Sequence, residues 1–279
     1  MPGWIRGSAM SDRRALHAAA VTLGLVCVSA LIGPTLVFAH NGFTYETQAV
    51  GDAFAAPSSA HWLGTDILGR DVLVRLVYGT RISLLVGVVA TAVALAIGVS
   101  YGAIAGYLGG WIDEGLMRIV DVLYSLPTII LIAILLALFG RSVWLVIVTL
   151  GAISWLTIAR ITRGEVLRVK TELFVESARA MGVSGPRVLT RHIVPNVLGP
   201  IVVYATLALP LVMLDEAFLS FLGLGVPPPA ASWGVLVQQG ANAMAVRPLL
   251  LIAPTLVMGM TILAFNVIGD ALRDAMSGK

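Results

Sequence analysis

The sequence holds few of the residue sets that perform chemistry. No G-x-x-x-x-G-K-[ST] stretch is present, so the chain has no phosphate-binding loop of the Walker type. It has no H-E-x-x-H or C-x-x-C motif, and its four histidines and one cysteine argue against an ordinary metal site. The only lysines, Lys170 and Lys279, lie outside the apolar segments, which argues against a serine–lysine membrane protease. We predict that the chain is not an enzyme, and we expect no catalytic residue, metal or cofactor on it.

Charge is instead concentrated in one segment, residues 163–196. Of the 33 charged residues (18 basic and 15 acidic), ten lie between Arg160 and Arg191. Long apolar runs flank this segment on both sides. A membrane protein with its polarity gathered in this way is expected to bind something there.

Composition places the chain in a membrane. Its 279 residues are 58% hydrophobic and 12% charged, against about 25% charged residues in a soluble domain. Too little polar surface remains to cover a water-soluble globule, so lipid must solvate much of it. The net charge of +3 does not indicate nucleic-acid binding, because the arginines are distributed by membrane side and are not clustered with aromatic residues. The single Cys27 lies in an apolar run, reads as a small packing residue and excludes an intrachain disulfide.

Six apolar runs are long enough to cross a bilayer, since about 20 helical residues span about 30 Å of hydrocarbon. Pro227, Pro228 and Pro229 interrupt the chain between the last two runs. We predict an all-α integral membrane protein with six transmembrane helices at residues 15–39, 82–107, 122–140, 142–159, 193–222 and 248–269.

The basic residues predict the orientation of these helices. With the N-terminus inside, 13 fall on the cytoplasmic side and 5 outside, so both termini are expected in the cytoplasm. The inner set is Arg6, Arg13, Arg14, Arg118, Arg160, Arg163, Arg168, Lys170, Arg179, Arg187, Arg191, Arg273 and Lys279; the outer set is Arg70, Arg75, Arg81, Arg141 and Arg247. A cleaved signal peptide is disfavoured because its apolar part spans only about 7–15 residues, fewer than the first run.

The outer loop, residues 40–81, contains charges at helical spacing. Asp66 with Arg70, and Asp71 with Arg75, form i,i+4 pairs with the acid first, the favourable order. We expect a helix after Gly64, capped by Thr65 or Asp66 and lying at the bilayer surface. Two interpretations stay open: solvated charges on an interfacial helix, or a surface that receives an extracytoplasmic partner.

Two acidic residues lie late in the fifth apolar run. Asp215 and Glu216 are adjacent, so they point about 100° apart on a helix and cannot form a simple carboxylate dyad. Their distance from Ile193 places them near the outer mouth, where they are either solvated or part of a permeation path. A secondary transporter acting alone would need ionisable residues at mid-depth and inverted repeats, and neither is clear in the sequence.

The charged cytoplasmic segment predicts a short helix. Residues 172–181 suit a helix with Leu173, Ala178 and Met181 on one side, and Gly182 is well placed to end it. Ser184, Gly185 and Pro186 would start a second element that stops at Pro195. Spacing alone leaves an ordinary basic loop and a helix that binds in a partner's groove equally open.

Several stretches resemble permeases of ABC importers. E-S-A-x-x-x-G at residues 176–182, then ten residues and I-V-P, resembles the signature E-A-A-x-x-x-G…I-x-L-P. Ser177 stands in place of alanine and Val194 in place of leucine. Over about residue 60 to the end, four stretches are similar to the oligopeptide/dipeptide/nickel family of these permeases. They are "HWLGTDILGRDVLVRLVYGTRISLLVG", "GYLGGWIDEGLMRIVDVLYSLP", "ARAMGVSGPRVLTRHIVPN" and "FLSFLGLGVPPPAASWG". Within this family, the chain looks most like the second (C-type) permease.

This resemblance implies a function and partners. The chain would be a multi-pass permease of a bacterial cell membrane, with a type I importer core of five helices plus an N-terminal helix. It would pair with a second homologous permease, two cytoplasmic P-loop ATPases holding ATP and magnesium, and an extracytoplasmic substrate-binding protein. Dipeptides or oligopeptides are the commonest cargo of the family; nickel, haem and other small solutes are alternatives.

The resemblance also implies roles for residues and segments. The expected ATPase-coupling residues are Glu172, Glu176, Ser177, Ala178, Gly182, Ile193 and Pro195. The expected residues at the outer mouth or facing the binding protein are Asp66, Arg70, Asp71, Arg75, Asp215, Glu216 and Trp233. The expected segments are a cytoplasmic tail 1–14, a first helix 15–39, an outer loop 40–81, a permease core 82–270 with a coupling region 160–195, and a cytoplasmic tail 271–279.

Overall fold

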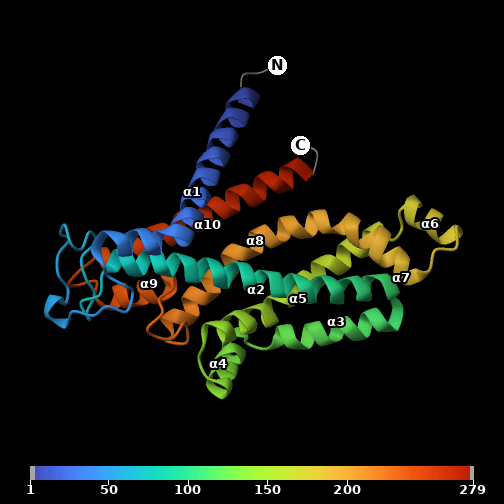
Figure 1. The fold of residues 1–279 in the computed structure, drawn as a ribbon. Helices are drawn as coiled ribbons and strands as arrows, with labels where there is room; N and C mark the ends of the chain where they lie inside the picture. Colours follow the sequence, from blue (N-terminus) through green and yellow to red (C-terminus); the bar gives the residue numbers. More distant parts are fainter. Residues whose placement is uncertain (1–3, 277–279) are drawn as a thin grey trace.

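The computed structural model describes the backbone of residues 4–276 and the side chains of residues 13–276. Within these residues the chain is helical, without a β-strand, and Figure 1 shows the helices in chain order. The elements are α1 (Trp4–Asn41), a 3₁₀ turn (Val50–Asp52), α2 (Val72–Leu108), α3 (Gly110–Ser125), α4 (Thr128–Phe139), α5 (Val143–Val169), α6 (Leu173–Ala180), α7 (Gly185–Val188), a π-helical turn (Leu189–Ile193), α8 (Val194–Phe221), α9 (Trp233–Asn242) and α10 (Leu249–Met276).

Five helical segments are long and apolar enough to cross a membrane, and the bent pair α3 and α4 makes a sixth if it forms one span. In Figure 1, α2, α5 and α8 run side by side along the long axis of the molecule. The loop after α1 and α9 lie at one end, called here the α9 end, and α6 and α7 lie at the other, the α6 end. The beginning of α1 and the end of α10 lie on the same side of the molecule.

The predicted third span, residues 122–140, was wrong in its bounds and its shape. The helical segment begins earlier, with α3 at Gly110, and α3 and α4 meet at an angle of 83°. The break falls at Leu126, which is extended with φ −76° and ψ 139°. Proline explains it: the ring of Pro127 disfavours a helical conformation in the residue before it and removes a backbone donor.

Other predicted boundaries shift because helices continue past their apolar parts. The segment expected as an N-terminal tail is largely helical, since α1 starts at Trp4. Helix α2 starts at Val72, ten residues before the expected second span, and α10 runs to Met276 through most of the expected C-terminal tail. Residues 1–3 and 277–279 of the two expected tails lie outside the described residues.

A row of glycines brings α2 against α5. Gly98, Gly102 and Gly106 lie four residues apart, on one face of α2. A Cβ atom on Gly102 would lie 2.3 Å from the carbonyl oxygen of Ala159, and one on Gly98 would lie 2.6 Å from the Cβ of Ile158. Small residues at this spacing let two membrane helices pack backbone against backbone. The letters G-V-S-Y-G at residues 98–102 match the G-x-S-x-G pattern, but they lie inside α2 and form no strand-to-helix nucleophile turn.

We predict that Gly102→Val destabilises the chain by about 2–3 kcal/mol, because the added side chain overlaps backbone atoms that cannot move independently. Thermal unfolding of the purified protein in detergent measures the effect. Gly115→Ala on α3 is the matched control, since nothing lies within 4 Å of a Cβ atom at that position. An unfolding temperature equal to that of the control would show that this contact does not hold α2 and α5 together.

Candidate functional site

Helix α6 confirms the short helix predicted in the charged segment. Glu172 is its N-cap residue, and the helix runs from Leu173 to Ala180. Gly182 adopts the left-handed conformation with φ 79°. The N–H of Val183 donates to the carbonyl of Ala178 at 3.1 Å, and that of Gly182 donates to the carbonyl of Arg179 at 2.9 Å. These two bonds form a Schellman motif, which fixes where α6 ends and makes glycine the favoured residue at position 182.

The two faces of α6 differ from the prediction. Val175 and Ala178 are buried, whereas Leu173 and Met181 are 79% and 77% exposed. Leu173, Ala178 and Met181 therefore do not share one side, because the helix directs Ala178 into the protein. An apolar surface remains that no other part of the described chain covers, formed by Leu173, Phe174 and Met181.

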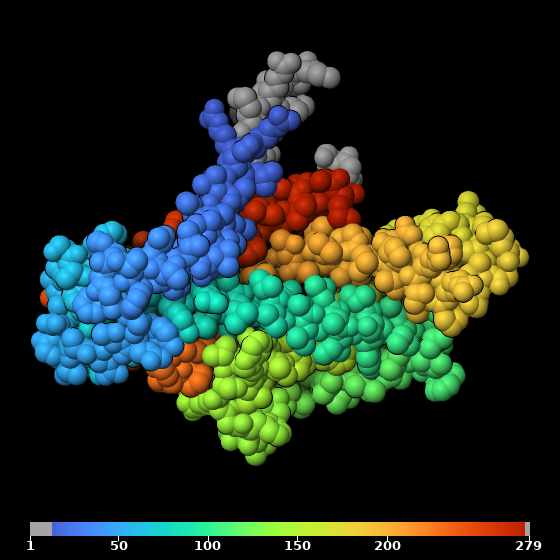
Figure 2. Space-filling model, in the orientation of Figure 1, coloured from blue at the N-terminus to red at the C-terminus, as the bar shows by residue number. Residues whose placement is uncertain are grey.

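The polar side chains of α6 do not cover this apolar surface. Glu176 is exposed, and its carboxylate has no hydrogen bond or ion pair within the described chain. Ser177 Oγ donates to the carbonyl of Leu173 at 2.8 Å, inside the helix. In Figure 2 the segment around α6 forms the tip of one end of the molecule.

Behind α6 lies a buried apolar cluster that connects it to the long helices. Val175 and Ala178 pack with Ile193, Val197 and Ile201 of the π-helical turn and α8, and the cluster also contains Val166 and Val169 of α5. Ile193 is fully buried. Ala178 and Ile193, from the two halves of the E-S-A-x-x-x-G…I-V-P pattern, thus pack in one cluster.

The prediction that an element stops at Pro195 was wrong. The π-helical turn leads directly into α8, and Pro195 lies in the first turn of α8. Proline is tolerated in a first helical turn, and the wider turn before it accommodates the missing donor.

At the α9 end, Asp66 organises the loop that precedes α2. Its Oδ1 accepts from the backbone N–H of Leu68 and Arg70, at 2.8 and 3.0 Å. Its Oδ2 accepts from Arg70 Nε at 2.8 Å and from Arg75 Nη1 at 2.6 Å. Two guanidinium groups therefore share one carboxylate, and all three side chains are buried.

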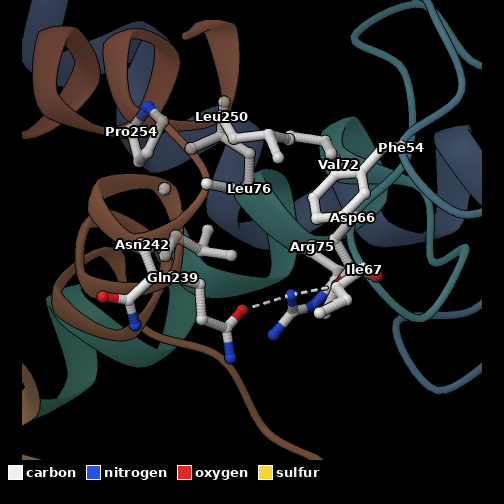
Figure 3. A pocket seen from close by; sticks show the side chains of 13 residues that line it. Phe54, Asp66, Ile67, Val72, Arg75, Leu76, Gln239, Asn242, Leu250 and Pro254 are labelled. Carbon is white, nitrogen blue, oxygen red and sulfur yellow. Dashed lines mark hydrogen bonds and ion pairs between the residues drawn. The ribbon is translucent and has the colours of Figure 1, made fainter. Parts of the chain in front are cut away.

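Arg75 also links the loop to α9, as Figure 3 shows. Its Nη1 donates to Gln239 Oε1 at 2.7 Å, across 164 residues of sequence. Its Nε is buried without a partner. Beside it lies a cavity of about 170 Å³ with largely apolar walls, which include Phe54, Leu250 and Pro254.

Asp71 plays a different part from the one predicted. Its Oδ1 caps α2 by accepting from the N–H of Val74 at 2.9 Å, and its Oδ2 lies 2.8 Å from His61 Nδ1. It makes no pair with Arg75. No helix forms between Gly64 and Asp71, since α2 begins at Val72. The interpretation of solvated charges was wrong, because all four charged side chains are buried.

Glu216 and Trp233 each bond two hydroxyl side chains, and the two sets of partners are different. Glu216 Oε1 accepts from Ser220 Oγ at 2.8 Å and from Ser232 Oγ at 2.6 Å. Trp233 is fully buried; its backbone N–H donates to Ser83 Oγ at 2.9 Å and its Nε1 to Thr80 Oγ1 at 3.1 Å. Glu216 thus holds α9 against α8, and Trp233 holds α9 against α2.

Asp215 points away from this cluster, as its position next to Glu216 on the helix predicts. It faces a separate cleft of about 310 Å³, called here the α8 cleft. Helices α2, α3, α4, α5 and α8 contribute to its walls. Its polar lining consists of Thr91, Tyr124, Thr128, Ser154, Thr157, Tyr204 and Asp215.

The sequence analysis did not predict some members of these clusters. Helix α9 and the partners Gln239, Ser232 and His61 were not anticipated. Ser232 carried a usable signal, because a serine before a short amphipathic stretch favours an N-cap, and its Oγ accepts from the N–H of Val235 at 3.2 Å. No comparable sequence signal marked Gln239. The described residues contain no group of three or more His, Cys, Asp or Glu side chains that could hold a metal ion.

The comparisons agree with this architecture. Residues 98–279 match the family described as binding-protein-dependent transport system inner membrane component. The chain belongs to this family. It is therefore a multi-pass inner-membrane permease subunit, a non-catalytic component of an ABC transporter.

Named relatives cover most of the chain. It is 46% identical over 268 residues, or 95% of its length and 87% of the relative's, to the oligopeptide transport system permease protein OppC of Escherichia coli (strain K12). It is 42% identical to the dipeptide transport system permease protein DppC of Bacillus subtilis (strain 168), covering 90% of this chain and 78% of that one. A structure of the MetNI methionine ABC transporter matches with a TM-score of 0.57 and 21% identity, covering 71% of this chain and 95% of the other, which shows a shared fold.

We predict that Asp66→Asn destabilises the permease by about 3–5 kcal/mol, because it leaves Arg70 and Arg75 buried without their counter-charge. Thermal unfolding in detergent measures this. Asp52→Asn is the control, since Asp52 is an exposed acid in the same loop. Equal unfolding temperatures for the two variants would contradict the stabilising role of the buried pairs.

Proposed function

We propose that this permease is one of two homologous membrane subunits of an ATP-driven importer for dipeptides or oligopeptides. The observation that carries the proposal is the 46% identity to an oligopeptide permease over 95% of the chain. A dipeptide permease and a glutathione permease are similar to it over 90% and 86% of its length. All three of these relatives are named for transport of peptides.

The α6 end faces the cytoplasm in this proposal, and the α9 end faces outward. Support comes from the basic residues, of which 13 lie on the side expected to be cytoplasmic and 5 on the other. Both termini are then cytoplasmic. The five-helix importer core begins with α2, and α1 adds a helix packed on α2 and α10.

Helix α6 is the part that contacts a cytoplasmic ATPase. Leu173, Phe174 and Met181 would insert into a groove of that subunit, and Glu176 would offer its unpaired carboxylate to a donor at the rim. Two such ATPases bind ATP and magnesium, since this chain has no phosphate-binding loop. Movement of α6 would reach the membrane through Val175 and Ala178, which are packed on the start of α8 and the end of α5.

The α9 end would receive an extracytoplasmic substrate-binding protein. The loop between α1 and α2 and the α9 segment form one connected body there. Arg75 bonds Gln239, and Arg247 Nε donates to the carbonyl of Phe54 at 2.8 Å. The buried residues Asp66, Arg70, Asp71, Glu216 and Trp233 would then shape this outer surface without forming it themselves.

We predict that Leu173→Asp lowers the amount of ATPase that co-purifies with the permease roughly ten-fold, because it places a charge in an apolar contact. The permease should reach the membrane in normal amount, since Leu173 is 79% exposed in this chain. Peptide uptake by cells or proteoliposomes should fall in parallel.

Thr190→Asp serves as the control, because it adds the same charge at an exposed site in the same region but outside α6. If Leu173→Asp retains the ATPase as fully as Thr190→Asp does, α6 does not couple the two subunits. If the intact importer accumulates no peptide when ATP and binding protein are present, the proposed cargo is wrong.

A further inference from the structure

The carboxylate of Asp215 has no partner in the structure. It is exposed to the α8 cleft and makes no hydrogen bond or ion pair with any described residue. Glu216, the next residue, points about 100° away around the helix and accepts from two serine hydroxyls. Asp215 lies within a membrane-spanning helix, where an unpaired acid is costly and marks a polar path or a bound cation.

Within residues 13–276 no cationic side chain serves the carboxylate. Among the described residues that line the α8 cleft, none is arginine, lysine or histidine. Arg160 stacks on the ring of Tyr124, a lining residue, with its Cζ 4.3 Å from the ring centroid. Its Nη2 already donates to Asp121 at 2.7 Å. The cleft therefore presents the Asp215 carboxylate without a counter-charge from the described part of the chain.

The rest of the cleft is suited to a polar backbone. Thr91 Oγ1 is buried, lines the cleft and has no hydrogen-bond partner. Along α8 the lining runs from Tyr204 to Asp215, eleven residues or about 16 Å of helix. An extended peptide advances about 3.3 Å per residue, so roughly four to five residues match this length. Apolar walls between the hydroxyls, including Ile153 and Leu211, leave room for varied side chains.

We propose that Asp215 binds the amino-terminal ammonium group of the transported peptide inside the α8 cleft. The peptide backbone lies along α8, and Thr91 donates to one of its carbonyl groups. The charge of the carboxylate selects cargo with a free amino terminus, whereas the hydroxyl groups read only the backbone, which all peptides share. This inference rests on the proposed function and adds a cargo site within the membrane part of this subunit.

A test uses the complete importer, with its binding protein and ATPases, in proteoliposomes. Asp215→Asn should slow ATP-driven uptake of a tetrapeptide with a free amino terminus roughly ten-fold, because it removes a charge-assisted contact. Asp215→Glu should retain most of the uptake. Asp270→Asn is the charge-matched control, since it removes an exposed carboxylate of α10 outside the cleft. Uptake by Asp215→Asn equal to that of Asp270→Asn would overturn the proposal.

A second measurement tests contact directly. During turnover a water-soluble carbodiimide should join the Asp215 carboxylate to the peptide's amino group as an amide, located by mass spectrometry of the permease. The product should be absent from Asp215→Asn and with an N-acetylated peptide. Transport without this product in the wild-type importer counts against the contact, even if Asp215→Asn is slow.

The competing explanation is that a basic residue of the second permease pairs with Asp215. In that case Asp215→Asn would release the second permease from the purified complex, which would overturn the cargo site. Failure of the proposed function looks different, because then the wild-type importer itself takes up no peptide. The cargo site alone fails if the wild type and Asp215→Asn import peptide equally well.

Discussion

The close packing of α2 against α5 is the constraint on which the rest of the structure depends. Helix α2 begins at the α9 end, capped by Asp71, and ends near α6. Helix α5 runs beside it and leads, after a short turn, into α6. Glycines at positions 98, 102 and 106 let the two backbones touch, so the pair forms a stiff rod between the two ends. The buried cluster around Asp66 at the α9 end and the exposed face of α6 are thus held by one body.

The sequence predicted the helical class, most of the spanning segments and a short helix at 172–181, which the structure has at 173–180. These features depend on hydrophobic run length and on local signals such as Gly182, which act over a few residues. The bend at Pro127 shows what the length of an apolar run cannot predict. Such a run indicates burial in lipid, but it does not indicate the direction in which the helix axis runs. The glycine row on α2 was present in the sequence, yet nothing in it named α5 as the partner helix.

The outer loop shows why pair rules fail outside helices. Asp66 and Arg70 do pair at the predicted spacing, but they do so in a loop that their own hydrogen bonds shape. Asp71 and Arg75 have the same spacing and do not pair, since Asp71 caps a helix and Arg75 turns toward Gln239. Local spacing could not anticipate this, because Gln239 belongs to a helix that follows the fifth predicted span.

The bond between Arg75 and Gln239 also has a consequence for biosynthesis. The two residues are 164 positions apart, and ribosomes add about 5–20 residues each second, so Arg75 emerges roughly 8–33 s before its partner. In the finished structure Arg75 donates to Asp66 and to Gln239. Of these two residues, Asp66 alone has been synthesised during that interval. Helix α1 likewise packs against α10, which is synthesised last of the helices. Membrane insertion of this chain therefore passes through a stage in which the α9 end is incomplete, and this end is completed only when the last third of the protein has been synthesised.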